Sequence, residues 1–345
     1  MSEYIVKESA LVDFFKSLAN GRRLLTPRGT GDKCQLAETE PASVGLDFAN
    51  THMSPKAVLF PQTEGLMAFA KKGEKRDIYE DLGPKAVPTV IFGIRPCDAR
   101  GLSVSDKVFQ NDRFTDPYWK GKKDGLALIG LACEKPLPQC FCAVMGGSPY
   151  GETGLDALAF KTDGGLGIRP LTPKGEEIVK AAGLQTADLA ADLKAKEQTA
   201  IAAQGGGNTW PEINEKDLMV LFSDPHWTAT AEGCLNCGAC TFFCPTCHCF
   251  DIQDETSEAG GLRMRNWDTC MSWLFTIHGT GHNPRPSKTE RVRQRFMHKL
   301  KYIPLKQDGV RGCTGCGRCV VVCPVNIDIK SVALKMSQSA APSQA

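Results

Sequence analysis

The residues in this chain of 345 amino acids that could do chemistry are above all its sixteen cysteines. Two segments repeat the pattern C-x2-C-x2-C-x3-C-P. They are Cys234, Cys237, Cys240 and Cys244 before Pro245, and Cys313, Cys316, Cys319 and Cys323 before Pro324. Zinc sites usually space their ligands as two separated pairs, whereas this compact spacing is typical of thiolates that hold 4Fe-4S cubanes. The pattern therefore predicts two 4Fe-4S clusters.

The ligands of the two clusters are expected to cross over. In this pattern the first three cysteines of a motif hold one cluster, and the fourth holds the cluster of the other motif. One cluster is then held by Cys234, Cys237, Cys240 and Cys323, and the other by Cys313, Cys316, Cys319 and Cys244. Crossed ligands keep the clusters close together, so this part of the chain is predicted to be a bacterial-type two-cluster ferredoxin module that carries electrons.

Four more cysteines follow apolar segments in the first half of the chain. Residues 87–94 and 125–131 read as buried strands, and residues 98–109 between them read as a helix with Asp98 as its N-cap. Parallel strands end at a common edge, where α/β folds build their sites. The cysteines that follow these strands are Cys97, Cys133, Cys140 and Cys142. Spacing alone leaves three interpretations open, namely a third 4Fe-4S cluster, a zinc site or four buried thiols.

The elements that position these cysteines suggest an α+β fold. A mixed α/β domain is expected at residues 1–207, ending at the glycines 205–207, and the ferredoxin-like module at residues 208–336, with a flexible tail at 337–345. The 68 residues between the two motifs form a long insertion that we expect to be helical. Its basic stretch, residues 291–301, is interpreted either as a solvated helix face or as a docking site for an acidic partner.

Composition excludes several classes of protein. The net charge of +2 does not fit a nucleic-acid binder, and no apolar run is long enough for a transmembrane segment. The N-terminal residues do not read as a secretory signal, so we expect a cytoplasmic protein, in which clustered cysteines bind metal rather than form disulfides. No G-x-G-x-x-G motif follows a predicted strand, which argues against a nicotinamide or FAD site in this chain.

Several motifs together resemble a known family of 4Fe-4S dicluster-domain electron-transfer subunits. The matching segments are residues 93–100, 130–133, 140–142, 244–249, 265–270, 281–286 and the motif that begins at Cys313. The family includes the beta subunits of sulfhydrogenases and one of the subunits of anaerobic sulfite reductase. The resemblance implies three 4Fe-4S clusters, with the third at Cys97, Cys133, Cys140 and Cys142, and it leaves Cys34, Cys247, Cys249 and Cys270 without a role.

The resemblance also implies partners. A flavoprotein subunit linked to NAD(P)H or ferredoxin would exchange electrons with this chain, and a terminal redox subunit would be a hydrogenase, a sulfite reductase or a heterodisulfide reductase type. The chain itself would then be a non-catalytic electron-transfer subunit of an oxidoreductase complex in anaerobic metabolism. Two alternatives remain at this stage: a catalytic iron-sulfur reductase that binds a small substrate near Arg95 and Arg100, and a zinc-stabilised scaffold.

Overall fold

The computed structural model describes residues 2–72, 75–84, 86–204 and 212–339. The chain forms two compact units. The first unit comprises residues 1–59, 84–208 and 314–316, and the second comprises residues 60–83, 209–313 and 317–345. The predicted boundary between residues 207 and 208 lies outside the described residues and stays a prediction. The same holds for residues 340–345 of the predicted tail.

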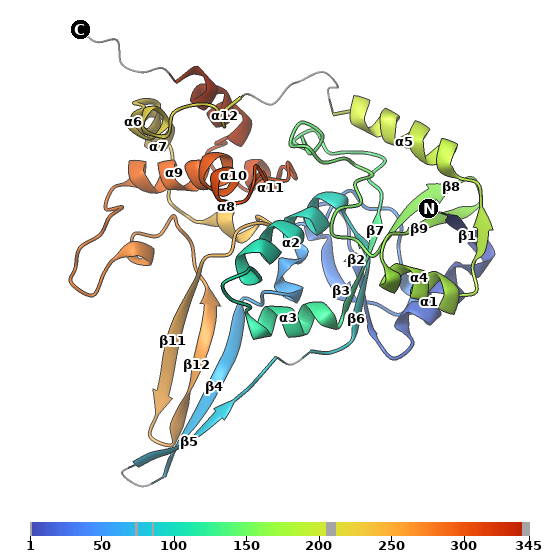
Figure 1. The fold of residues 1–345 in the computed structure, drawn as a ribbon, viewed down its shortest axis with the longest axis horizontal. Coiled ribbons are helices and arrows are strands. Elements are labelled where there is room, and N and C mark those ends of the chain that lie inside the picture. The colour runs from blue at the N-terminus through green and yellow to red at the C-terminus, as the bar shows by residue number, and fades with distance from the viewer. Residues whose placement is uncertain (1, 73–74, 85, 205–211, 340–345) are drawn as a thin grey trace. The chain divides into compact units, whose positions relative to one another are not determined.

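The first unit is built around an eight-stranded sheet with the order β10-β1-β9-β8-β7-β6-β2-β3 (Figure 1). Strands β2, β6, β7 and β8 run parallel to one another, and the remaining pairs are antiparallel. The elements are β1 (Glu3–Lys7), α1 (Leu11–Ala19), β2 (Arg23–Arg28), β3 (Gln35–Glu38), β6 (Thr89–Ile94), α2 (Pro96–Phe109), α3 (Pro117–Asp124), β7 (Leu126–Leu131), β8 (Ala157–Thr162), β9 (Gly165–Pro170), α4 (Pro173–Ala181), β10 (Gln185–Ala187) and α5 (Ala190–Ala202).

The two predicted buried strands are present and lie side by side. All residues of β6 and β7 are buried, and the strands pair in parallel as predicted. Helix α2 starts earlier than predicted. Its N-cap is Arg95 and Pro96 occupies the first turn, so the prediction of Asp98 as N-cap was wrong. Proline suits this position because its fixed φ fits a helix and it lacks an N–H that would go unpaired.

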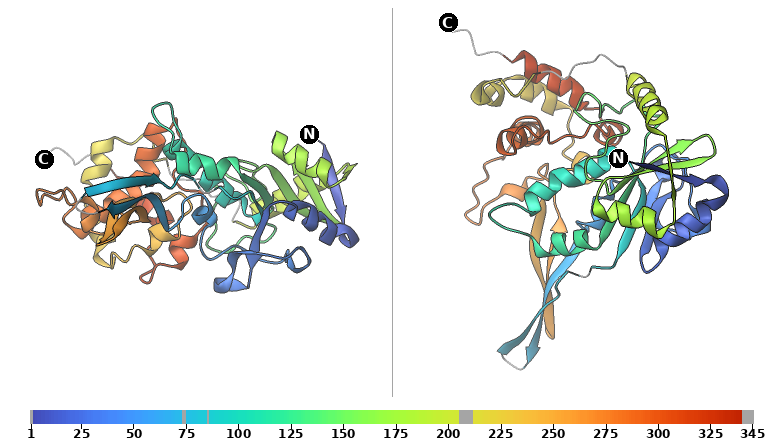
Figure 2. Two further views of the ribbon diagram at one scale, coloured as in Figure 1. Left: turned by 90° about the horizontal axis from the view of Figure 1, so that it is seen from below. Right: turned by 45° about the vertical axis from the view of Figure 1, so that its right-hand side comes forward.

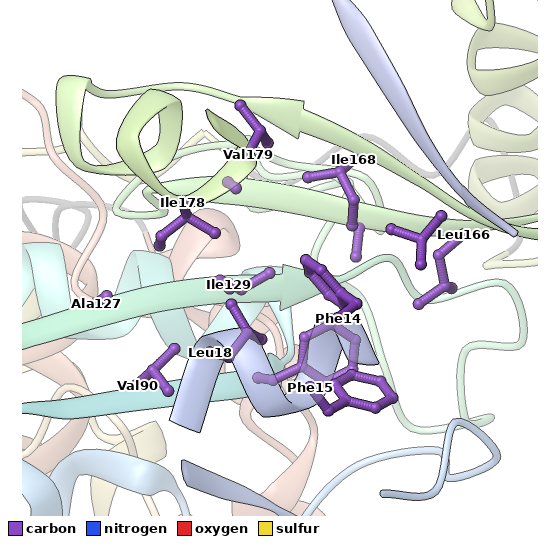
Figure 3. Packing of buried hydrophobic residues seen from close by; sticks show 14 of the residues in the cluster. Phe14, Phe15, Leu18, Val90, Ala127, Ile129, Leu166, Ile168, Ile178 and Val179 are labelled. Atoms are coloured by element: carbon purple, nitrogen blue, oxygen red, sulfur yellow. The ribbon is translucent and has the colours of Figure 1, made fainter. Parts of the chain in front are cut away.

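The hydrophobic core of the first unit lies on one face of the eight-stranded sheet. Helix α1 contributes Phe14, Phe15 and Leu18, and α4 contributes Ile178 and Val179, all packed on the central strands (Figure 3). Helices α2 and α3 cover the opposite face (Figure 1). With helices on both faces, the central strands are fixed, and so are the loops at their carboxyl ends.

The second unit combines short helices with a four-stranded antiparallel sheet in the order β11-β12-β4-β5. The sheet is long and narrow (Figures 1 and 2). The elements are β4 (Thr63–Lys72), β5 (Lys75–Asp81), α6 (Leu218–Ser223), α7 (His226–Glu232), α8 (Ala239–Phe242), β11 (Phe250–Ser257), β12 (Gly260–Trp267), α9 (Lys288–Met297), a π-helical segment (His298–Tyr302), α10 (Ile303–Lys306), α11 (Arg318–Val321) and α12 (Ile329–Gln338). No helix among the described residues is long and apolar enough to cross a membrane.

The insertion between the two cysteine motifs has its α-helices only in its second half, after a 3-10 helix at Leu274–Thr276. It opens with the β11–β12 hairpin, and the helix α9 follows after a loop. Helix α9 begins with a capping box, in which the Ser287 side chain accepts from the Glu290 N–H and the Glu290 carboxylate accepts from the Ser287 N–H. This local signal fixes the start of the helix.

The basic stretch at residues 291–301 is not a solvated face. Arg295, Lys299 and Lys301 are buried, although residues of this type are rarely buried without a partner. Lys301 donates to the backbone carbonyls of Asn214 and Lys216, at 2.6 Å each. The prediction of a solvated basic helix was therefore wrong for these three cations, because they turn towards acceptors inside the second unit.

Candidate metal centres

Four cysteines of the second unit line one cavity. They are Cys234, Cys237 and Cys240 of the first motif and Cys323, the last cysteine of the second motif. We call this group site A. Cys319 also contributes to the cavity wall. The structure thus brings together the same four cysteines that the crossover rule assigns to one cluster.

Two left-handed glycines shape the turns at the motifs. Gly238 and Gly317 both have φ +74° and stand at the N-caps of α8 and α11. A Cβ on Gly238 would lie 3.0 Å from the Thr269 side chain and 3.1 Å from that of Phe242, so a larger residue would have to displace these side chains and would be strained at this φ. The repeated motif therefore folds into a repeated turn with a left-handed glycine before the short helix.

The lining of site A fits a 4Fe-4S cubane. Apart from its thiols, the cavity is walled mainly by apolar side chains, among them Leu235, Phe296 and Ile329. Backbone N–H groups point at two of the sulfurs, from Asn236 to Cys234 at 3.4 Å and from Ile327 to Cys323 at 3.2 Å. An all-thiol donor set in an apolar pocket, with N–H groups directed at sulfur, is the environment that a cubane requires.

The other predicted set, Cys244, Cys313, Cys316 and Cys319, divides between the two units. Cys316 belongs to the first unit and the other three to the second. Around Cys244 the second unit forms a buried polar network. The Thr246 hydroxyl lies 3.2 Å from the Cys244 sulfur and donates to the Gly312 carbonyl at 2.8 Å. The ligand role of this set stays a prediction.

The cysteines of the first half of the chain also share a cavity, within the first unit. It is lined by Cys97, Cys133, Cys140 and Cys142, which we call site C. Cys97 lies in the first turn of α2, directly after β6, and Cys133 follows β7. The carboxyl ends of these two neighbouring parallel strands bring the cysteines together, as the sequence predicted.

Arg95 fixes the loops around site C. Its Nε donates to the Ala49 carbonyl at 2.8 Å, and one terminal nitrogen donates to the carbonyls of Leu131 and Ala132 at 2.9 and 2.6 Å. The other terminal nitrogen donates to the Phe48 carbonyl. A buried guanidinium with all three nitrogens engaged ties the end of β7 to the segment 48–49, and it leaves Arg95 committed to the backbone.

Amide side chains reach the sulfurs of site C. The Gln204 Nε2 donates to the Cys142 sulfur at 3.0 Å, and the Asn50 Nδ2 lies 4.0 Å from the Cys97 sulfur. Burial raises the pKa of the Cys142 thiol, and the hydrogen bond from Gln204 partly offsets this. Burial also raises the pKa of Cys140, to about 12. These thiols ionise readily only if a cation such as iron compensates their charge.

A segment from the second cysteine motif forms part of the same cavity. Gly315 and Cys316 line it together with the four cysteines of site C. The Phe141 N–H donates to the Gly315 carbonyl at 2.8 Å, and the Cys140 thiol donates to the Cys316 carbonyl at 3.8 Å. Sequence reasoning did not place Cys316 here, because nothing in the local pattern connects two segments so far apart along the chain.

Comparison with known proteins finds a match for the part of the chain that contains the two cysteine motifs. Residues 233–327 match the family model described as a 4Fe-4S dicluster domain. This part of the chain is thus similar to the domains that hold two 4Fe-4S clusters. Over 325 residues it is 28% identical to the sulfhydrogenase 2 subunit beta of Pyrococcus furiosus, with 92% of each chain covered. The resemblance noted from the motifs is thus confirmed, and no solved structure matches the chain.

Three further cysteines lie in the dicluster domain. A hydrogen bond with Cys270 lowers the pKa of Cys249. The same hydrogen bond and burial both raise the pKa of Cys270. Cys247 lies 3.7 Å from a terminal nitrogen of Arg295.

No disulfide joins any of the sixteen cysteines in the described part of the chain. In the same residues, no three His, Cys, Asp or Glu side chains are grouped as ligands of a single metal ion.

Gly315 offers a test of the contact between the dicluster motif and site C. Its φ is +69°, and a Cβ would lie 2.6 Å from the backbone N and Cα of Cys142. We expect Gly315→Ala to push the Cys140–Cys142 loop away and to remove at least about four irons per chain, the content of one cubane. Iron and acid-labile sulfide in anaerobically purified protein measure the loss.

Gly21→Ala is the matched control for this test. Gly21 has φ +68° in the same unit, but a Cβ there would meet no atom within 4 Å. Both variants carry a left-handed alanine, which costs about 1–2 kcal/mol, but only Gly315→Ala produces a collision. Full iron content in Gly315→Ala, or equal iron loss in the two variants, would contradict the predicted contact.

Proposed function

We propose that this chain is an electron-transfer subunit with three 4Fe-4S clusters, at site A, at site C and at the set Cys244, Cys313, Cys316 and Cys319. When bound, such clusters accept and donate single electrons. In the proposal a flavoprotein subunit linked to NAD(P)H or ferredoxin exchanges electrons with one end of the chain. A terminal redox subunit of the hydrogenase, sulfite reductase or heterodisulfide reductase type exchanges electrons with the other end. The whole complex is proposed to work in the cytoplasm.

The observation that carries the proposal is the contact between the Cys140–Cys142 loop and the segment Gly315–Cys316 in the first unit. Hydrogen bonds join the two segments, and both line one cavity. Cys316 is a predicted ligand of a different cluster from the one at site C. A cluster at site C would therefore lie beside a ligand of the next cluster, an arrangement that supports a relay rather than an isolated centre.

Site A supplies the second end of the proposed relay. Cys237 is exposed, and Leu235 beside it is exposed as well. An exposed ligand brings the edge of a cluster to the protein surface, where a partner can exchange electrons with it. The relative from Pyrococcus furiosus is named as a subunit of a sulfhydrogenase, which supports the proposal that this chain too works with other subunits.

The alternative of a catalytic reductase at site C finds less support. It needs Arg95 and Arg100 to bind an anionic substrate, but all three nitrogens of Arg95 donate to backbone carbonyls, which leaves only Arg100 for this role. Asp98 is buried in the first turn of α2. Arg95 and Asp98 are therefore not offered to a substrate.

Metal analysis tests the proposal. The full chain, purified anaerobically with whatever partner proteins accompany it, is expected to contain about twelve irons and twelve acid-labile sulfides, with flavin in a separate co-purifying protein. A content of about eight irons and eight sulfides would contradict the proposed cluster at site C. Zinc without sulfide would overturn the proposal, and turnover of a small substrate by the isolated chain would favour the catalytic alternative.

A further inference from the structure

Two buried cations face the cysteines of the dicluster domain. Arg295 in α9 and Lys299 in the π-helical segment lie four residues apart, about one turn of helix, and each is only 3% exposed. Burying a charged group is costly unless an opposite charge compensates it. Burial alone would lower the pKa of Arg295, but the sulfurs of Cys240 and Cys247 raise it well above its usual value overall.

Arg295 holds Cys240 by two hydrogen bonds. Its Nε donates to the Cys240 sulfur at 3.0 Å, and a terminal nitrogen donates to the Cys240 carbonyl at 2.8 Å. Arg295 also lines the cavity of site A together with Cys240. The guanidinium is thus fixed in position, with its positive charge in direct contact with a predicted cluster ligand.

Lys299 reaches its cysteine less directly. Its Nζ donates to the Thr246 hydroxyl at 2.5 Å and to the Gly312 carbonyl at 3.2 Å. The Thr246 hydroxyl in turn lies 3.2 Å from the Cys244 sulfur. The crossover rule assigns Cys244 to the other cluster, so the hydrogen bonds of the two cations lead to ligands of different predicted clusters.

We propose that Arg295 is a positioning residue that raises the reduction potential of the cluster at site A through its hydrogen bond to Cys240. The inference rests on the proposed function, because it requires a 4Fe-4S cluster at site A. One-electron reduction, by dithionite in the test below, adds one negative charge to the cluster and its thiolates. A cation bonded to a ligand sulfur stabilises the more negative state, so reduction becomes easier.

The test is a potentiometric titration of the full chain, purified anaerobically and followed by electron paramagnetic resonance. In Arg295→Gln the signal of site A is expected to require a more negative potential. The equilibrium constant for reduction should fall about tenfold, which corresponds to about 59 mV for a one-electron couple. Arg295→Lys keeps the charge but not the paired hydrogen bonds, so its shift should be smaller and in the same direction.

Arg293→Gln is the matched control. Arg293 lies in the same helix, its guanidinium stacks on the Phe222 ring at 3.6 Å, and it donates to the Phe222 carbonyl. Its removal changes the net charge equally and should leave the potential unchanged. An unchanged potential in Arg295→Gln with full iron content would overturn the inference, as would an equal shift in Arg293→Gln.

Iron content separates failure of this inference from failure of the proposed function. If the parent protein holds no cluster at site A, the proposed function fails before any potential is measured. If Arg295→Gln does not assemble the cluster, Arg295→Lys decides the matter. A potential in Arg295→Lys identical to that of the parent protein would then overturn the role assigned to Arg295.

Discussion

Replacing Cys234 and Cys323 together by alanine is expected to lower the iron content from about twelve to about eight per chain. The two residues lie in different motifs, 89 positions apart, but line the same cavity in the second unit. If both hold one cluster, removing both costs only that cluster. The pair Cys234→Ala and Cys313→Ala takes a ligand from each predicted cluster and should lower the iron content to about four per chain.

The comparison between the two pairs tests crossed ligation without relying on the size of any single effect. Each pair removes two thiols, so general destabilisation acts equally on both, and only the assignment of ligands differs. Iron and sulfide analysis measures the outcome. If each motif instead held its own cluster, both pairs would take a ligand from each of the two clusters, and both would leave about four irons per chain.

The sequence predicted local structure around the candidate sites well where the determining signal is local. The spacing within residues 234–245 and 313–324 depends on a turn of a few residues, and the structure places a left-handed glycine at the same point of each turn. Strands β6 and β7 could be predicted because each is a short apolar run bounded by Gly, Pro or Lys. The cysteines that follow them converge because neighbouring parallel strands end at one edge.

Features that depend on distant segments could not be predicted in this way. Strands β4 and β5 belong to the second unit, because β4 pairs with β12, almost two hundred positions later in the chain. The segment Gly315–Cys316 packs against the Cys140–Cys142 loop for the same kind of reason. Arg295 was misassigned because charge patterning assumes that cations face solvent, whereas Arg295 donates to the sulfur and the carbonyl of Cys240 inside the second unit.

The cavity of site C leaves a question of ligand choice that a second pair of variants answers. Five cysteines line it, Cys97, Cys133, Cys140, Cys142 and Cys316, and a cubane takes four. We expect Cys97→Ala with Cys133→Ala to remove about four irons per chain, because both thiols belong to one cluster. Cys133→Ala with Cys316→Ala should remove about eight, because Cys316 belongs to the neighbouring cluster.

The physical reason for this choice lies in how the five sulfurs are presented. Gln204 donates to the Cys142 sulfur, and Arg95 fixes the backbone just before Cys133, whereas Cys316 meets the Cys140 thiol through its backbone carbonyl. This hydrogen bond of Cys316 is thus made by its backbone, and the crossover rule assigns its sulfur to the neighbouring cluster. Loss of only about four irons in the pair with Cys316 would make Cys316 a ligand of site C. The proposed neighbouring cluster would then lack Cys316 as a ligand, and the proposed relay would have only one cluster at this cavity.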